Sequence, residues 1–305
     1  MAKLYYRNLM FLVAAHGLAV VALLYLIFDQ PPWQTCALGL LWFGCCGISI
    51  TGGYHRLFAH RTYRAAWPIR LFYLLFGAAS LQNSALRWCA DHRAHHADTD
   101  GGRDPYNILH GFLWAHIGWV IFQADGTQEL GRVRDLTGDP LLRFQHRLYL
   151  PLAIIMGAAL PGVLGSLWGD AFGVLLVAGC LRLVLQWHAT FAVNSLAHTI
   201  GHQPYTTTVS ARDSWLTALI TFGEGYHNYH HRFPSDYRNG VRWYQFDPTK
   251  WFVWVLARVR LASELRRVPP EMIERVRRSL MSCRRTSELR ETGNTRPVPH
   301  HIEVS

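Results

Sequence analysis

The amino-acid sequence predicts an all-α integral membrane protein, with four transmembrane helices and a cytoplasmic helical cap that holds a histidine-rich metal site. Three observations predict this class. Half of the 305 residues are hydrophobic although the formal net charge is +10, a combination that is unusual for a soluble domain. The hydrophobic residues are gathered into long runs with almost no charge. Histidines are gathered into three short clusters beside the ends of those runs.

The uncharged runs are long enough to cross a bilayer core, which takes about 20 residues of helix. The first run, Leu9–Phe28, is too long for the core of a signal peptide and is followed by no small-residue cleavage site, so we interpret it as an anchor. The fourth run carries one charged residue, Arg182. The predicted spans are residues 9–28, 35–54, 149–168 and 171–193.

The basic residues predict the orientation of these spans. Lys3 and Arg7 precede the first span, whereas the loop 29–34 after it has no lysine or arginine. Arginines are frequent in the long regions 55–148 and 194–270. By the positive-inside rule, both termini and both regions lie in the cytoplasm, where the two regions form the cap. We expect the membrane to be the inner membrane of a bacterium.

Three further segments have a recognisable character. Ile69–Leu81 is apolar but short, which predicts a buried or re-entrant helix. Phe112–Phe122 is rich in aromatic residues and predicts a helix that lies along the membrane surface. Residues 271–305 are polar and rich in arginine, and we expect them to form a disordered tail.

The histidine clusters read HRLFAH (55–60), HRAHH (92–96) and HNYHH (227–231). Random placement of the histidines predicts about 0.05 copies of HxxHH, against the two that are present. Histidine is the commonest neutral nitrogen ligand for transition metals. In HxxHH the histidines stand at i, i+3 and i+4, on one face of an α-helix, so the three can converge on one point.

The first cluster has a different spacing. His55 and His60 are five residues apart, about 140° around an α-helix, so they do not share a face of a regular helix. Gly52 and Gly53 just before them indicate that the helix breaks or ends there. The pair could then reach one common centre or two neighbouring metals.

Eight clustered histidines exceed the four ligands of one zinc ion. Two metals with four or five ligands each is the simplest division, and His198 in NSLAH is a ninth candidate, with His202 one turn further on. A ligating imidazole usually donates its other N–H to a carboxylate or carbonyl. Candidates for that role are Asp91, Asp98, Asp100, Asp104 and Glu224. His16 and His188 are single polar residues within spans, where a hydrogen bond between helices is the ordinary explanation.

The order of these motifs resembles the membrane-bound fatty acyl desaturases, and most closely the stearoyl-CoA (acyl-CoA delta-9) type. The resemblance covers about residues 5–270 and includes HRLFAH, QNSALRWCADHRAHH (82–96), DPYN (104–107), GFLWAHIGW (111–119), NSLAH (194–198) and GEGYHNYHH (223–231). It implies a desaturase domain over residues 1–270, mushroom-shaped, with two iron ions in the cap.

The resemblance also implies a role for particular residues. The implied iron ligands are His55, His60, His92, His95, His96, His198, His227, His230 and His231, with Asn194 acting through a water. The implied substrate channel is lined by Gln82, Asn83, Trp88, Asp91, Thr190 and Phe191. Phe191, at the bend of the implied channel, departs from the tryptophan usual in the animal members.

The implied reaction inserts a cis double bond, most commonly at the ninth carbon, into a saturated long-chain acyl-CoA. Oxygen is the co-substrate, and two iron ions cycle between Fe2+ and Fe3+. Removing hydrogen from an unactivated methylene needs a redox-active metal, which zinc is not. The chain has no glycine-rich dinucleotide motif and no haem or iron–sulfur motif. We therefore expect an external electron donor such as a ferredoxin or a small cytochrome with its reductase, alongside membrane lipid as a partner and no nucleic acid.

Three alternatives are open. The same chemistry could act on acyl groups already esterified in phospholipid, because the acyl-CoA interpretation needs phosphate-binding residues, for which the candidates are Arg56, Arg61, Arg64, Arg238 and Lys250. A similar di-iron centre could hydroxylate fatty acids or alkanes. A metal transporter would place ionisable residues inside the spans, which hold only His16, His188 and Arg182.

Overall fold

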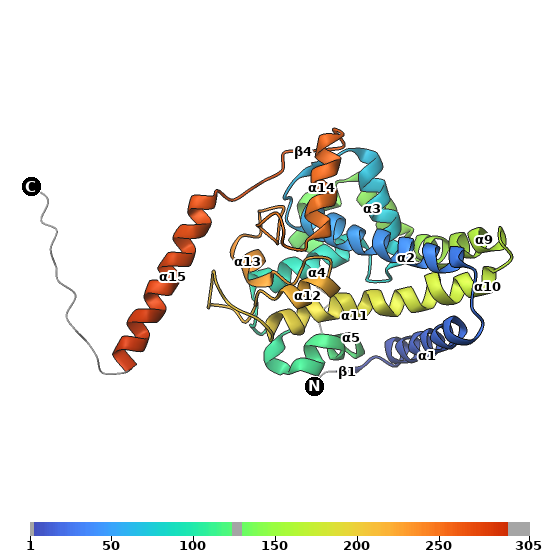
Figure 1. Cartoon of the computed structure of the whole chain (residues 1–305), viewed down its shortest axis with the longest axis horizontal. Coiled ribbons are helices and arrows are strands. Elements are labelled where there is room, and N and C mark those ends of the chain that lie inside the picture. The colour runs from blue at the N-terminus through green and yellow to red at the C-terminus, as the bar shows by residue number, and fades with distance from the viewer. Residues whose placement is uncertain (1–2, 124–129, 292–305) are drawn as a thin grey trace, which may run out of the picture.

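The computed structural model describes residues 3–123 and 130–291 of the chain, and these residues are mostly helical. Four helical segments are long and apolar enough to cross a membrane, which confirms the predicted spans to within a few residues at most of their ends. They run side by side (Figure 1). Their bounds are Tyr6–Phe28, Trp33–Ala59, Tyr149–Ser166 and Ala171–His198.

Three of the spans are built from consecutive helices. The second joins α2 (Trp33–Ile48) to the π-helix η1 (Ser49–Ala59). The third consists of α8 (Tyr149–Ile154), η5 (Ile155–Ala159) and α9 (Leu160–Ser166). The fourth consists of α10 (Ala171–Val174), η6 (Leu175–Leu181), α11 (Arg182–Asn194) and η7 (Leu196–His198).

The first span, α1 (Tyr6–Phe28), packs one narrow face against the fourth span and leaves the rest of its apolar surface open. Its small residues Ala15, Ala19 and Ala22 are buried in this contact, as expected where helices approach closely in a membrane. Met10 and Ile27 on its outer face are 71% and 65% exposed. Such a continuous apolar surface is stable when it faces lipid hydrocarbon, so the chain is a multi-pass membrane protein.

Charged residues within and next to the spans are satisfied inside the bundle. The Arg182 side chain is buried, and its Nε and Nη1 donate to the carbonyls of Ala178 and Ala79 at 2.8 Å each. Asp170 caps the N-terminus of α10 and accepts hydrogen bonds from the hydroxyls of Tyr25 and Thr35. Buried polar groups in lipid need such partners, and these tie three spans together.

The cap is formed by short helices between and after the spans. Its helices are α3 (Trp67–Ala79), α4 (Ala85–Ala97), η2 (Ile108–His110), η3 (Trp114–Gly118), α5 (Trp119–Ile121), η4 (Leu130–Val133), α6 (Arg134–Thr137), α7 (Pro140–Arg147), α12 (Trp215–Ile220), α13 (His227–Arg232) and α14 (Pro248–Arg258). Two antiparallel pairs of two-residue strands join distant segments: β1 (Lys3–Leu4) with β3 (Phe122–Gln123), and β2 (Arg64–Ala65) with β4 (Ala262–Ser263). The short apolar helix expected over residues 69–81 is confirmed as α3.

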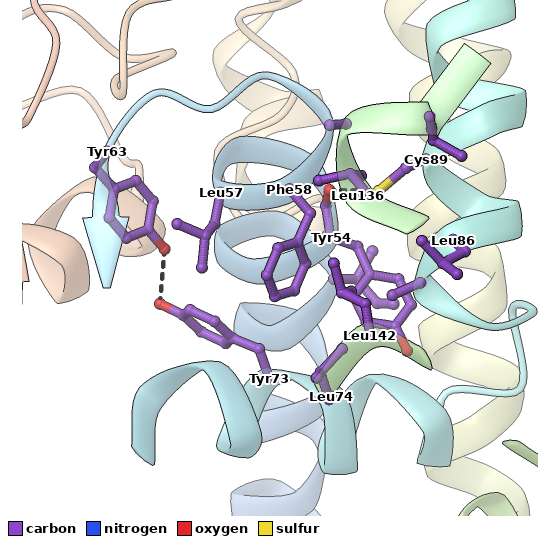
Figure 2. Packing of buried hydrophobic residues seen from close by; sticks show 14 of the residues in the cluster. Tyr54, Leu57, Phe58, Tyr63, Tyr73, Leu74, Leu86, Cys89, Leu136 and Leu142 are labelled. Atoms are coloured by element: carbon purple, nitrogen blue, oxygen red, sulfur yellow. Dashed lines mark hydrogen bonds between the residues drawn. The ribbon is translucent and has the colours of Figure 1, made fainter. Parts of the chain in front are cut away.

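The largest buried cluster joins η1 to α3 and α4 (Figure 2). Tyr54, Tyr73 and Leu74 are fully or almost fully buried there, and the hydroxyls of Tyr63 and Tyr73 lie 3.0 Å apart. Gly53 is required at this contact, because a Cβ on it would lie 2.5 Å from the Cβ of Tyr73. The cluster holds the helices on which two of the histidine motifs stand.

Residues 271–291 are not the disordered tail that the sequence predicted. They form most of α15 (Pro270–Glu291), which begins at a proline followed by an acidic residue, both favourable at a helix N-terminus. Ile273 is buried against Tyr229 and Phe233 of the cap, and Val276 adds to the same contact. These apolar residues, three apart on one helix face, are the signal that the arginine-rich composition obscured. Residues 292–305 lie outside the described part of the chain.

Candidate metal centre

Nine buried or half-buried histidines, all of them candidates from the sequence, converge in two groups. The five-histidine group contains His55, His60, His92, His96 and His230, and the four-histidine group contains His95, His198, His227 and His231. Within each group the ligand nitrogens lie within 4.8 Å of one another. The structure therefore confirms the prediction that the histidines divide into two sets of four or five.

Each HxxHH motif is divided between the two groups, so the expectation that its three histidines converge on one point is wrong. His92 and His96 belong to the five-histidine group, whereas His95 faces the four-histidine group. In α13, His227 and His231 face the four-histidine group, whereas His230 faces the five-histidine group. Neighbouring residues of an α-helix point about 100° apart. A helix that runs between two sites therefore serves both.

The π-helix η1 explains how His55 and His60 reach the same group. The backbone N–H of His60 donates to the carbonyl of His55 at 3.1 Å, the i to i−5 bond of a π-helix, which stacks one residue over the other. The helix does not break or end at Gly52 and Gly53, as the sequence suggested. Both glycines lie inside η1, where they let the ring of Tyr73 approach.

The Nε2 atoms face one another across short distances. Nε2 of His60 lies 2.7 Å from that of His92, and Nε2 of His230 lies 3.0 Å from His55 and 2.9 Å from His96. In the second group, Nε2 of His231 lies 3.1 Å from His227 and 3.3 Å from His95. Nitrogens that each lie about 2.1 Å from a shared ion would be separated by about 3.0 to 3.4 Å.

Three of the histidines are oriented from outside by polar groups. Nδ1 of His55 lies 2.9 Å from Glu224 Oε2, and Nδ1 of His95 lies 2.9 Å from Asp104 Oδ1. Nδ1 of His198 lies 2.6 Å from the Ser210 hydroxyl, which in turn contacts Asp100. A donor at Nδ1 leaves the lone pair on Nε2 and aims it inward.

Of the five carboxylates expected from the sequence, Asp100, Asp104 and Glu224 are confirmed in this supporting role. For the carboxylates of Asp91 and Asp98, no contact with the nine histidine rings is described. Asp98 instead accepts from the Arg103 backbone N–H at 2.8 Å and lies beside its guanidinium.

Glu224 belongs to a fully buried ionic network. Besides His55, it accepts from Arg56 Nη2 at 3.0 Å and from Asn239 Nδ2 at 2.6 Å. Arg56 also pairs with Asp247, and both side chains are essentially inaccessible to solvent. The neighbouring His55 and Arg56 lower the pKa of Glu224, although burial alone would raise it. The carboxylate stays ionised and holds His55 from behind.

The charge state of the imidazoles suits metal binding. Burial, and then the other imidazoles around them, lower the pKa values of His60, His92 and His96 well below the usual value. The same causes lower the pKa values of His227, His230 and His231. The rings are thus neutral, and neutral lone pairs that face each other need a cation between them.

These observations fit a metal ion in each group. The Nε2 atom of His198 is buried and has no hydrogen-bond partner among the described residues, as expected of an atom reserved for a metal. An all-nitrogen donor set of four or five imidazoles suits iron, copper, nickel or zinc rather than magnesium or calcium. Asn194, the remaining ligand implied by the resemblance, is half-buried at the end of α11, four residues before His198.

Several of the candidate substrate residues form one hydrogen-bonded bridge beside the five-histidine group. Trp88 stacks on the ring of His92 with a centroid distance of 5.0 Å, and its Nε1 donates to Gln82 Oε1 at 3.3 Å. Gln82 Nε2 in turn donates to the Thr190 hydroxyl of α11 at 2.9 Å. The bridge therefore connects α4 to the fourth span.

The side chains of the other three candidates are not part of this bridge. The Asn83 backbone N–H donates to the Tyr149 hydroxyl. Burial raises the pKa of Asp91 to about 7. Phe191 is buried and packs edge-on against Trp119 at a centroid distance of 6.2 Å.

Two of the residues suggested for binding phosphate are unavailable for that role. Arg56 is committed to the buried network with Glu224 and Asp247. Lys250 is also buried, and its Nζ donates to three backbone carbonyls between residues 240 and 245. The sequence shows their charge but not their burial. The other three candidates pair with acidic residues: Arg61 with Asp135, Arg64 with Glu264 and Arg238 with Asp236.

A second set of histidines lies outside the two groups. Nε2 of His16 lies 3.0 Å from Nε2 of His188, which confirms the hydrogen bond between helices expected for this pair. His188 Nδ1 contacts His116 Nε2 at 3.0 Å, and His116 Nδ1 contacts the Ser195 hydroxyl. This linear arrangement joins α1, α11 and η3 and does not enclose a common point.

The fold and the two groups define a membrane-embedded protein with two adjacent histidine groups, each of which could hold a metal ion. Comparison with known proteins gives the family, because a model of the family described as fatty acid desaturase matches residues 31–260. The chain therefore belongs to the fatty acid desaturase family.

Named relatives are similar over most of the chain. It is 46% identical over 263 residues to a probable acyl-CoA desaturase of Schizosaccharomyces pombe, which covers 85% of this chain and 54% of the relative. It is 45% identical over 230 residues to acyl-CoA desaturase 1 of Saccharomyces cerevisiae, covering 75% and 45%. It is 36% identical over 279 residues to the delta(9)-fatty-acid desaturase fat-7 of Caenorhabditis elegans, covering 90% and 82%. The chain thus spans about half the length of the two fungal relatives.

Proposed function

We propose that this protein is an oxygen-dependent acyl-CoA desaturase that inserts a cis double bond at the ninth carbon of a saturated chain. The observation that carries the proposal is the pairing of two all-histidine groups at the ends of apolar spans. The names of relatives that are 35–46% identical support the substrate and the position of the bond. The catalytic domain proposed is residues 1–270.

The proposed cofactor is a pair of iron ions. The five-histidine group would hold one and the four-histidine group the other, with Asn194 contributing to the second through a water. Iron in these groups would supply the oxidising power to remove two hydrogens from an unactivated methylene pair. The overall reaction consumes the acyl chain, oxygen, two electrons and two protons, and yields the alkene and two waters. An acidic external donor such as a ferredoxin or a small cytochrome suits the basic cap.

The chain's own residues bind, orient and shield the substrate in this proposal. The bridge from Trp88 through Gln82 to Thr190 fixes the distance between α4 and α11 beside the five-histidine group, so it sets where an acyl chain bends. The buried ring of Phe191, which follows Thr190 in the chain, would add an apolar surface there. Burial of the histidines excludes bulk water, so metal ions held there would act on the methylene in surroundings from which water is largely absent.

The proposed orientation places the cap and both termini in the cytoplasm, because the arginines are concentrated in the cap and the loop 29–34 has none. The proposed membrane is the bacterial inner membrane. In that arrangement the metal centre lies just beneath the lipid headgroups on the side where reduced donor proteins are present.

Product analysis tests the proposal. Membranes from cells expressing the full chain are supplied with stearoyl-CoA or with stearoyl-labelled phospholipid, plus a reducing system and oxygen, and the products are measured by gas chromatography and mass spectrometry. We expect a cis-9 monoene from the CoA ester, none from the His95→Ala variant, and an unchanged yield from His110→Ala, whose side chain is exposed and outside both groups. Monoene from phospholipid alone, or a hydroxylated product, would replace the proposal with one of its alternatives.

A further inference from the structure

A cationic groove lies between α15 and the loop that follows the fourth span. It has a volume of about 270 Å³ and is lined by Gly201, His202, Gln203, Pro204, Arg212, Arg277, Leu280, Met281 and Arg284. A water takes about 30 Å³ in the liquid, so the groove has room for a tetrahedral anion and part of its carrier. Three of the lining residues are arginines, and among the described lining residues no carboxylate balances them.

The arginines of this groove keep donors to spare. Arg212 donates from Nη1 to the Gly201 carbonyl at 3.2 Å, and Arg284 donates from Nη2 to the Gln203 carbonyl at 2.8 Å. The Nε atoms of Arg212 and Arg277 are buried and have no hydrogen-bond partner among the described residues. A buried guanidinium N–H without an acceptor is costly, and a bound ion is one of its ordinary explanations.

The carboxylates nearest in sequence do not supply the missing acceptor. Asp213 does not line the groove, and its Oδ1 accepts from the Tyr229 backbone N–H at 3.0 Å. Glu274, one helical turn before Arg277, pairs with Arg278 at 3.3 Å. The net charge of the groove is therefore positive. The donors that line it belong to guanidinium groups, which form bidentate hydrogen bonds with oxyanions.

We propose that this groove binds a phosphate group, held by Arg212, Arg277 and Arg284. The phosphate can come from the headgroup of an anionic lipid or from a free phosphate ester, since both offer the same tetrahedral oxyanion. Bound there, it joins α15 to the loop 201–212 and balances the positive charge of the three guanidinium groups.

The site has a mechanical connection to the four-histidine group. The backbone N–H of Arg212 donates to the Ala197 carbonyl at 2.7 Å, and the Arg212 carbonyl accepts from the His227 N–H at 3.2 Å. Gly201 cannot carry a side chain here, because a Cβ would lie 2.2 Å from the Asp213 carbonyl oxygen. An anion that immobilises Arg212 therefore also restrains the backbone next to His198 and at His227, two members of the four-histidine group.

Phosphate titration of the full chain, purified with its metals in detergent and phosphate-free buffer, tests the site without a measurement of activity. Binding is followed by calorimetry and by hydrogen exchange of residues 201–212. We expect saturable binding of inorganic phosphate that slows this exchange. We expect it to be at least about tenfold weaker in the double variant Arg277→Gln, Arg284→Gln, because each charged hydrogen bond lost is worth about that factor. Arg275→Gln, on the same helix but outside the groove, should bind like the native chain.

The source of the phosphate is distinguished in nanodiscs. Competition by phosphatidic acid in a phosphatidylcholine background identifies a lipid headgroup, and its absence identifies a free phosphate ester; either result agrees with the site. Equal binding by the double variant and Arg275→Gln, or no binding by the native chain at about 10 mM phosphate, overturns it. Because these measurements need neither substrate nor electrons, their failure leaves the proposed desaturase activity untouched.

Discussion

Replacing Asp104 by asparagine should weaken one of the two metal sites and spare the other. Asp104 is buried, and its two oxygens both act as acceptors. Oδ1 contacts His95 Nδ1 at 2.9 Å and the Tyr106 N–H at 3.2 Å, while Oδ2 accepts the Asp100 N–H at 3.0 Å. An asparagine has only one acceptor atom. In either orientation its NH2 group faces an N–H donor, so a side-chain flip does not restore the network.

The size of the effect follows from what His95 loses: in one orientation its acceptor becomes a neutral amide oxygen in a disrupted network, and in the other it has no acceptor. Partners that orient a metal-binding histidine are worth about 10- to 100-fold in metal affinity. That factor corresponds to about 1.4 to 2.7 kcal/mol, similar to the value of a hydrogen bond to a charged group. His95 belongs to the four-histidine group alone. The loss should therefore fall on one ion of the pair.

Chelator competition measures this directly. Purified protein is titrated with an iron chelator, and the iron retained per chain is determined by mass spectrometry. We expect Asp104→Asn to release one of two irons at about 10- to 100-fold lower chelator concentration, and Asp98→Asn, whose carboxylate contacts Arg103 rather than a histidine, to behave like the native chain. Identical curves for Asp104→Asn and the native chain would refute the reasoning.

Two further predictions concern stability. Gly53→Ala should destabilise the fold by about 1 to 3 kcal/mol, because the new Cβ would lie 2.5 Å from the Cβ of Tyr73. Gly44→Ala is the control: no atom lies within 4 Å of its Cβ, so thermal unfolding should show it to be neutral or slightly stabilising. Burial raises the pKa of Asp213 to about 7, so the folded chain keeps a proton that the unfolded chain releases near pH 4. The stability that this group contributes is complete below about pH 4 and is lost as the pH rises towards 7. The melting temperature of Asp213→Asn should therefore depend less on pH between 5 and 8 than that of the native chain. Parallel profiles for the two proteins would exclude a raised pKa of Asp213.

Much of the membrane architecture can be predicted from the sequence because its physical cause is local. A bilayer imposes a minimum length on each apolar run, and the ends at Phe28 and Tyr149 agree with the structure. The extension of the second span from residue 54 to Ala59 could not be predicted in the same way. It depends on a π-helix, whose hydrogen-bond pattern leaves no recognisable signature in the side chains.

The metal centre could also be predicted only in part from the sequence. Composition and spacing identify the eight clustered histidines, since no other role accounts for such dense clusters, and His198 in NSLAH is a ninth candidate. They do not assign them to metals, because His95 and His96 are neighbours in sequence but face different groups. That assignment depends on where α4 lies relative to α13, which is a property of packing between distant segments. The roles of the nine histidines and Asn194 as iron ligands remain predictions.

Burial is the other property that the sequence concealed. Arg56 and Lys250 look like free cations in the printed chain, yet both are buried and committed to internal partners. Conversely, Arg277 and Arg284 stand in a segment whose composition predicted disorder, yet they line a groove on a helix. Charge can be counted from sequence, but its availability depends on tertiary contacts.

Locating the metal ions is the most direct test of the central claim that nine imidazoles form two adjacent sites. Crystals of protein produced with iron are measured above and below the iron absorption edge. We predict two anomalous peaks, one bounded by the Nε2 atoms of His55, His60, His92, His96 and His230 and the other by those of His95, His198, His227 and His231. A single peak, or histidine rings turned outward with no peak between them, would contradict this account of the protein.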